Sequence, residues 1–229
     1  MKRVEAVRQF RLASKSAPTQ KLAQTPTRFH VENMPTSTYL LIPKVSSERR
    51  DYIPIGFMHP DTFSSDLVFI VPDATLYHFG ILTSAMHMAW VRAVCGRLES
   101  RYRYSAGIVY NNFPWPECSP SPQTSPSKGE GAKREAIEAA AQAVLDARAQ
   151  FPDATLADLY DPLTMPPALL HAHQKLDAAV DRAYGKTGFK SDAERVAFLF
   201  ARYQALTSLL PAAAVKRRRK TTDAGGLGI

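Results

Sequence analysis

Hydrophobic side chains in the second half of the chain recur every three or four residues, the interval at which they share one face of an α-helix. This pattern covers residues 133–151, residues 167–184 and a segment that begins at Ser191 and Asp192. Ser191 is a typical N-cap and Asp192 a first-turn acid, so we expect a helix to start there. Three amphipathic helices with short connections predict a small helical bundle.

The first half mixes short and long apolar patterns. Short apolar stretches, two of them interrupted by proline as at the edge of a sheet, predict strands over residues 38–45, 52–57 and 66–71. Helical spacing over residues 76–98 predicts one long helix, with Gly96 as its C-terminal cap. Alternation over residues 101–110 predicts strands or a hairpin, with a turn at Asn111 and Asn112. The expected fold class is therefore α+β, a mixed sheet domain with one long helix, followed by a small all-α helical bundle.

A Ser/Pro/Gly-rich stretch, SPSPQTSPSKGEGAK, divides the two halves. Its composition is typical of an extended linker. We therefore expect four segments, which are a first domain over residues 1–118, a linker over 119–132, a helical domain over 133–210, and a basic disordered tail over 211–229.

The composition excludes wholesale disorder and favours an anionic partner. Hydrophobic residues make up 45% of the 229 residues, and the net charge is +8. The positive charge lies in the first half and in the terminal run KRRRK, whereas the helical half is slightly acidic. No apolar run reaches the ~20 residues of a membrane span, and the N-terminus lacks the apolar core of a secretory signal. We expect a cytoplasmic protein without membrane contact.

Sequence motifs for catalysis are missing. The glycines of KGEGAK and GGLGI follow no predicted strand, so we expect no cofactor in this chain. His171 and His173 would point apart on a helix, and no cluster has the spacing of zinc ligands. Residues 72–73 and 99–101 imitate the PD…ExK pattern of metal-dependent nucleases, but arginine stands where that chemistry needs lysine.

The segment SSERR offers recognition chemistry instead. Ser47, Arg49 and Arg50 fall in a predicted turn between strands. Hydroxyl and guanidinium groups suit phosphate oxygens, which fix the register of a protein on DNA. The alternative is a solvated turn with an internal Glu–Arg pair.

The segment RLESRYRY is more specific. On an extended strand, Glu99, Arg101 and Arg103 would share one face. Arginine can donate to guanine while glutamate accepts from cytosine N4, so a Glu–Arg pair can read the two halves of one G·C base pair. The alternative is an ordinary salt bridge on the protein surface.

Several long motifs resemble one known family. GILTSAMHMAWVRAVCGRL followed by YRYSAGIVYNNFPWP, with IPKVSSERRDYIPIGF upstream, resembles the target recognition region of MmeI-like (YeeA-type) type II restriction–modification DNA methyltransferases. LADLYDPLTMPPALLHAHQKLDAAVDRAYG resembles the helical tail of these enzymes. The resemblance implies that residues 1–118 are a target recognition domain, truncated at its N-terminus, that binds double-stranded DNA. It places Glu99 and Arg101 at the positions that read a base pair. The further DNA contacts expected are Arg103, Arg49, Arg50 and Ser47.

The resemblance stops short of the catalytic domains. The family's adenine methyltransferase domain carries a glycine-rich S-adenosylmethionine loop and a Pro-Pro-aromatic motif that holds a flipped adenine. FPWP lacks the Pro-Pro pair, and MPPA lacks its polar and aromatic neighbours. S-adenosylmethionine and catalysis would then belong to a separate methyltransferase or nuclease polypeptide. Two alternatives stay open, an assembly module whose helical half docks on a methyltransferase, and a truncated remnant without function.

Overall fold

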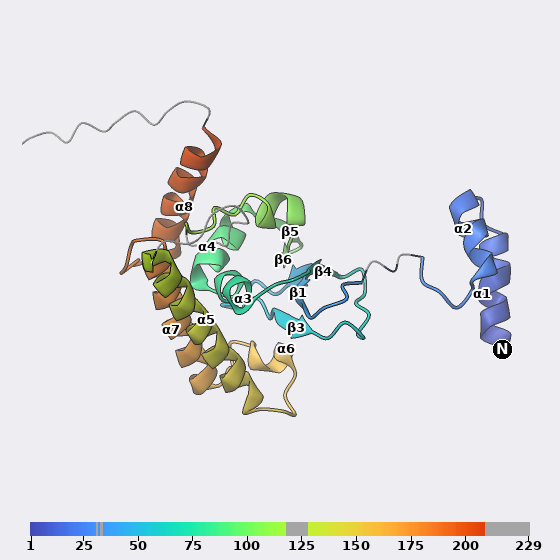
Figure 1. Cartoon of the computed structure of the whole chain (residues 1–229), viewed down its shortest axis with the longest axis horizontal. Helices are drawn as coiled ribbons and strands as arrows, with labels where there is room; N and C mark the ends of the chain where they lie inside the picture. Colours follow the sequence, from blue (N-terminus) through green and yellow to red (C-terminus); the bar gives the residue numbers. More distant parts are fainter. Residues whose placement is uncertain (31, 33, 118–127, 209–229) are drawn as a thin grey trace, which may run out of the picture.

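The computed structural model describes residues 1–30, 32, 34–117 and 128–208 and consists of helices around two small sheets (Figure 1). This arrangement confirms the α+β fold class. Within the described residues, no helix is long and apolar enough to cross a bilayer. The elements in chain order are α1 (Lys2–Leu12), α2 (Ala17–Lys21), the 3-10 helix η1 (Leu22–Gln24), β1 (Tyr39–Pro43), β2 (Val45–Ser46), β3 (Gly56–Met58), β4 (Val68–Val71), α3 (Leu76–Leu82), α4 (Ala85–Val94), β5 (Gly96–Leu98), β6 (Arg101–Arg103), the π-helix η2 (Ala106–Tyr110), α5 (Lys128–Ala149), α6 (Leu156–Leu159), α7 (Pro167–Ala183) and α8 (Asp192–Thr207).

Both sheets are antiparallel and three-stranded, with strand orders β3-β1-β4 and β2-β6-β5. In the first sheet, Leu40 lies opposite Phe57 on β3 and Val71 on β4. Strand β2 begins two residues after β1 ends, so one segment of chain leaves the first sheet and enters the second. That passage brings the turn after β2 beside the hairpin of β5 and β6.

The long helix expected over residues 76–98 is wrong in its extent, because α3 ends at Leu82 and α4 begins at Ala85. Ser84 is the N-cap of α4, and its hydroxyl accepts a hydrogen bond from a backbone N–H one turn further on, at 3.3 Å. The carboxylate of Asp177 accepts from the Ala85 N–H at 2.7 Å. These acceptors satisfy the free N–H groups of a new helix start, which a continuous helix would not expose.

Three further expectations for the first half are corrected. Gly96 is not a helix cap but the first residue of β5, where it pairs with Arg103. The strand expected over 101–110 ends at Arg103 and gives way to η2, whose N-cap side chain satisfies a backbone N–H. The strand expected over 52–57 is regular only from Gly56, the first residue paired with β1.

The three helices expected in the second half are confirmed as α5, α7 and α8. Helix α5 starts at Lys128, so the last residues of the expected 119–132 linker are helical. The rest of that linker and the basic tail over 211–229 lie outside the described residues. The short helix α6 and the N-terminal helices α1 and α2 were not expected from the sequence.

The helical half packs directly on the first half. Helices α5 and α7 lie against each other, α3 lies against α5, and α4 lies against α8 (Figure 1). At Gly80 of α3, an added Cβ atom would lie 2.7 Å from Ile137 Cγ2 of α5, so the two helices approach too closely for a side chain there. Buried residues from both halves form a single hydrophobic cluster. The expected bundle is therefore completed by α3 and α4.

Buried hydrogen bonds also join the halves. The Arg148 guanidinium donates to the Ile55 carbonyl at 2.8 Å and to the Tyr160 hydroxyl. The Tyr52 hydroxyl donates to the Asp177 carboxylate at 2.7 Å. Burial raises the pKa of Asp177 to about 6, even though the hydrogen bonds from the Ala85 N–H and the Tyr52 hydroxyl favour its charged form.

Candidate nucleic-acid interface

The hairpin of β5 and β6 carries the residues that the sequence favours for base contact. Leu98 pairs with Arg101, so Glu99 and Ser100 are the two residues of a tight turn. The backbone of Glu99 has φ of 59°, in the left-handed region, and Ser100 does not. This sign pattern is that of a type II′ turn, where glycine is the usual first residue. A glutamate there holds strained backbone, which persists where surrounding contacts enforce it.

The strand alternates between the core and the solvent. Tyr102 is only 4% exposed, whereas Arg101 and Arg103 on either side of it are exposed. Arg101 Nη2 lies 2.7 Å from Glu99 Oε2, and the two side chains are 46% and 77% exposed. The hairpin therefore presents one carboxylate and one guanidinium together at its tip, with a second guanidinium further along the same strand. Glu99 is a turn residue and not, as was expected, part of an extended strand, and its ion pair with Arg101 is the contact that the sequence left open as the alternative to base reading.

The turn after β2 lies against this hairpin. Val45 pairs with Arg103 and Ser46 with Tyr102. Hydrogen bonds from its own backbone N–H and from the Ser100 side chain hold the pKa of Glu48 below its usual range. Two segments about 50 residues apart in the sequence thus meet at the tip of the hairpin.

The members of the SSERR turn have different positions. Arg49 is exposed, and its backbone N–H donates to the Ser47 hydroxyl at 3.2 Å. Arg50 points the other way, and its guanidinium donates to the Ala157 carbonyl of α6 at 3.4 Å. Arg49 and Ser47 are therefore available at the surface, while Arg50 ties the turn to the helical half.

Sequence reasoning missed the contributions of Glu48 and Ser100. Glu48 contributes because β2 pairs with β6, and nothing in the local sequence predicts that pairing. Arg97, the first arginine of the RLESRYRY segment, pairs with Tyr102 and therefore lies on the opposite face of the hairpin from Arg101 and Arg103.

Replacing Glu99 with glycine should raise the free energy of unfolding by about 1 kcal/mol, because glycine adopts positive φ without strain. Urea unfolding measures the change. The matched control is Ser100→Gly, at a position without positive φ, which should destabilise the protein by adding backbone freedom and removing the hydroxyl beside Glu48. An unchanged or lower stability in Glu99→Gly would refute the claim of strain.

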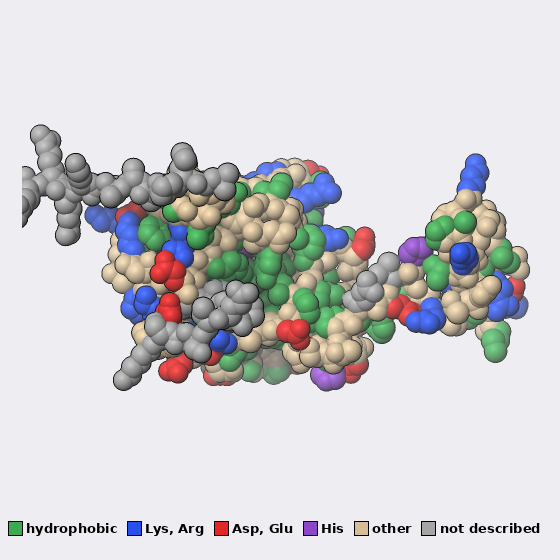
Figure 2. All heavy atoms as spheres, turned by 45° about the horizontal axis from the view of Figure 1, so that its top comes forward, with side chains coloured by type: hydrophobic (Ala, Val, Ile, Leu, Met, Phe, Trp, Pro, Cys, Tyr) green, Lys and Arg blue, Asp and Glu red, His purple; other side chains and the backbone are tan. Residues whose placement is uncertain are grey.

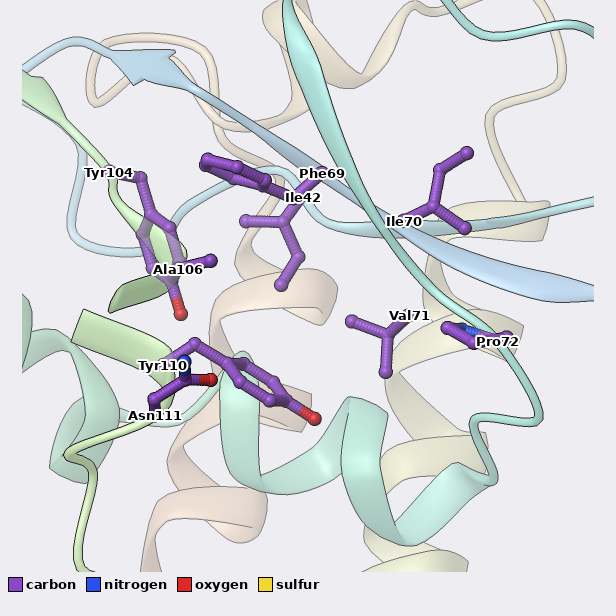
Figure 3. Close-up of a pocket in the computed structure, with 9 residues that line it drawn as sticks. All are labelled: Ile42, Phe69, Ile70, Val71, Pro72, Tyr104, Ala106, Tyr110 and Asn111. Carbon is purple, nitrogen blue, oxygen red and sulfur yellow. The ribbon is translucent and has the colours of Figure 1, made fainter. Parts of the chain in front are cut away.

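A pocket lies between β4 and η2. It has a volume of about 250 Å³, and Tyr104 and Tyr110 face Ile42, Phe69 and Val71 across it (Figure 3). Its walls are mainly apolar. Within the described ranges, no three His, Cys, Asp or Glu side chains gather as metal ligands.

The glycines of the KGEGAK segment do not form the cofactor loop of a methyltransferase. Gly129 and Gly131 of the KGEGAK segment lie inside α5, so they cannot form a loop that follows a strand and cradles the cofactor. The GGLGI segment lies outside the described residues.

A solvent-facing hairpin with a paired acid and base offers the groups with which a protein recognises a polar or charged partner. The family comparison is specific. The model of the MmeI target recognition domain matches residues 1–117, and the model of the MmeI C-terminal domain matches residues 129–211. The chain belongs to the MmeI family and consists of these two regions.

Two relatives support the assignment. The chain is 43% identical over 205 residues to DNA methyltransferase A of Bacillus subtilis (strain 168), a match that covers 90% of this chain and 22% of the relative. It is 48% identical to the solved structure of the type IIL restriction–modification enzyme MmeI in complex with DNA, with a TM-score of 0.79, covering 91% of this chain and 26% of that one. The chain thus spans about a quarter of the length of these relatives.

Proposed function

We propose that this chain reads DNA sequence for a restriction–modification methyltransferase, with Glu99 and Arg101 contacting the edges of one base pair. The observation that carries the proposal is the exposed carboxylate–guanidinium pair, 2.7 Å apart, at the tip of a hairpin. A two-stranded ribbon fits the major groove of B-DNA, where each base pair presents a distinct donor and acceptor pattern. The family assignment and the DNA complex of MmeI support this role.

The pair suits a G·C base pair by its chemistry. The Arg101 guanidinium would donate to guanine O6 and N7, and the Glu99 carboxylate would accept from cytosine N4. In the free protein the two groups neutralise each other at the surface, a contact worth little in water. Exchanging it for base contacts therefore costs little.

Phosphate contacts would come from the surrounding groups. Arg103 and Arg49 are exposed, and Ser47 offers a hydroxyl beside them. Arg50 would act by fixing the turn, because its guanidinium lies against Ala157. The methyltransferase, with its S-adenosylmethionine and its target adenine, would be supplied by another polypeptide or by a further part of a longer chain.

Binding to a random-sequence duplex should weaken steeply as salt rises, because arginines release counterions from the phosphates. Arg103→Gln and Arg49→Gln should each weaken binding to all sequences and make the slope of log K against log salt shallower by about 0.9. Fluorescence anisotropy between low and moderate salt measures both quantities. Arg182→Gln, at an exposed position on α7, is the matched control and should leave the slope unchanged. No duplex affinity, or affinity indifferent to salt, would contradict the proposal.

A second function is favoured by the N-terminal helices. In α1 no residue is buried, and Phe10 and Leu12 are 78% and 50% exposed. Figure 2 shows hydrophobic side chains among Lys and Arg side chains on this part of the surface. Such a face suits docking on a methyltransferase polypeptide. Co-purification with that polypeptide that survives nuclease and high salt would support docking, and loss of the complex on nuclease treatment would count against it.

A further inference from the structure

We propose that Arg97 is a positioning residue for base reading: it holds Ser100, the residue between Glu99 and Arg101, and so fixes where the reading pair points. The inference rests on the proposed function of that pair. Its own evidence is the geometry of the hairpin, which separates Arg97 from the two arginines that face outward.

The strand register places Arg97 on the same face of the hairpin as Tyr102, and the Arg97 side chain stays exposed there. Arg97 lies opposite Tyr102, whereas Arg101 lies opposite Leu98 and Arg103 opposite Gly96. Paired residues of an antiparallel sheet share a face, so Arg97 shares the face of the buried Tyr102. Its guanidinium lies over the Tyr102 ring, with Cζ 4.2 Å from the ring centroid. Arg97 therefore does not stand beside Arg101 and Arg103 in contact with the same DNA surface.

From this position Arg97 reaches back to the turn. Its Nη1 atom donates to the Ser100 carbonyl at 3.1 Å. On the other side, the Ser100 side chain and Glu48 interact, and this contact helps to lower the pKa of Glu48, as does the charge of Arg97 to a smaller extent. Ser100 is thus held by its carbonyl from β5 and by its hydroxyl from the turn after β2.

The Tyr102 ring, which lies beneath the Arg97 guanidinium, is held in place by its own contacts. Tyr102 is 4% exposed and packs in the main hydrophobic cluster. Burial acts to lower the pKa of Arg92, but the Asp192 carboxylate and, to a smaller extent, Tyr102 raise it above its usual value. Arg92 also forms a salt bridge with Asp192 at the start of α8. A continuous set of contacts therefore runs from α8 through Arg92, Tyr102 and Arg97 to Ser100.

The turn at Glu99 and Ser100 has strained backbone, and the hydrogen bond from Arg97 to the Ser100 carbonyl restrains it. A non-glycine residue with positive φ persists where neighbouring contacts over-determine it, and Glu99 is that residue here. Without the bond from Arg97 to the Ser100 carbonyl, the turn can relax to other conformations. Glu99 and Arg101 would then lose their common direction, while the exposed cations that hold the phosphates would stay in place.

The test compares variants of two arginines of one hairpin, Arg97 and Arg103. It measures two quantities, the ratio of affinities for the preferred and a random duplex, and the salt slope of binding to the random duplex. The preferred duplex is first selected with the wild-type chain from a randomised library. Arg97→Gln should lower the affinity ratio about tenfold and leave random-duplex affinity and its salt slope unchanged. Arg97→Lys should behave similarly, because an ammonium cannot stack on the ring and donate to the carbonyl in the same geometry. Arg103→Gln should weaken both duplexes equally and lower the slope.

The outcomes distinguish a positioning role of Arg97 from a phosphate contact and from no role in base reading. An unchanged affinity ratio in both Arg97 variants would overturn the positioning role. A uniform loss of affinity with a shallower salt slope would overturn it as well, because Arg97 would then be a phosphate contact. If Arg97→Gln unfolds, Arg97→Lys alone decides. A wild-type chain that selects no sequence would refute the proposed function itself, whereas a selective chain with indifferent Arg97 variants refutes only this inference.

Discussion

Replacing Arg148 with alanine should lower the free energy of unfolding by about 3 kcal/mol, because it removes the buried donor of the Ile55 carbonyl and leaves the Tyr160 hydroxyl with His173 as its partner. The guanidinium donates to the Ile55 carbonyl and to the Tyr160 hydroxyl, and it lies 5.0 Å from the ring centroid of Phe79. These partners come from the first half, from the segment after α6 and from α3. One side chain of α5 therefore joins three separate parts of the fold. Urea unfolding at neutral pH measures the loss.

The matched control for this variant is Arg182→Ala. Arg182 is exposed near the end of α7, and its removal should change stability by no more than about 0.5 kcal/mol. Equal effects of the two substitutions would mean that the buried hydrogen bonds of Arg148 contribute nothing net to folding.

Acidification from pH 6 to pH 4 should destabilise the protein by about 1.4 kcal/mol per pH unit. Burial lowers the pKa of both His87 and His173 to about 3, so the folded protein keeps them neutral where the unfolded chain, with a pKa of about 6.5, protonates them. Burial acts in the opposite sense on Asp177, whose pKa of about 6 lets the folded state bind one proton that the unfolded state releases. Two protons bound by the unfolded state against one bound by the folded state leave a net loss of stability as the pH falls.

The Asp177→Asn variant separates these contributions. It removes the carboxyl that opposes the histidines, so its loss of stability over the same range should be about 2.7 kcal/mol per pH unit. Urea unfolding at several pH values measures both slopes. Stability that is flat or rises between pH 6 and pH 4 in the wild-type chain would show that the buried histidines are protonated in the fold.

Hydrophobic periodicity was sufficient for the long helices and for the fold class. Helices α5, α7 and α8 follow their apolar stripes, and the N-cap at Ser191 was correct, its side chain accepting from the Glu194 N–H. Periodicity failed where tertiary contacts determine the ends of a helix. The break at Ser84 depends on Asp177, which lies 93 residues further along the chain and supplies an acceptor for the second helix. A local pattern cannot contain that information.

The candidate site was predictable in chemistry but not in geometry. The sequence indicated which side chains carry the charges of the hairpin, and it left a Glu–Arg salt bridge as the alternative to base reading; the structure shows that salt bridge between Glu99 and Arg101. The positive φ of Glu99, the position of Arg97 over the Tyr102 ring and the approach of Glu48 all depend on how β2, β5 and β6 pair. Short strands such as these carry too few residues for their sequence to fix their register.

Selection from a randomised duplex library, with the wild-type chain and with the double variant Glu99→Lys, Arg101→Asp, tests base reading most directly. The double variant reverses the charges at the hairpin tip and keeps the net charge of the pair. We predict that the two proteins select sequences that differ at one base-pair position, with a change in preference on the order of 10-fold or more at that position. Identical preferences in the two proteins would contradict the account, because base reading would then lie elsewhere than in Glu99 and Arg101.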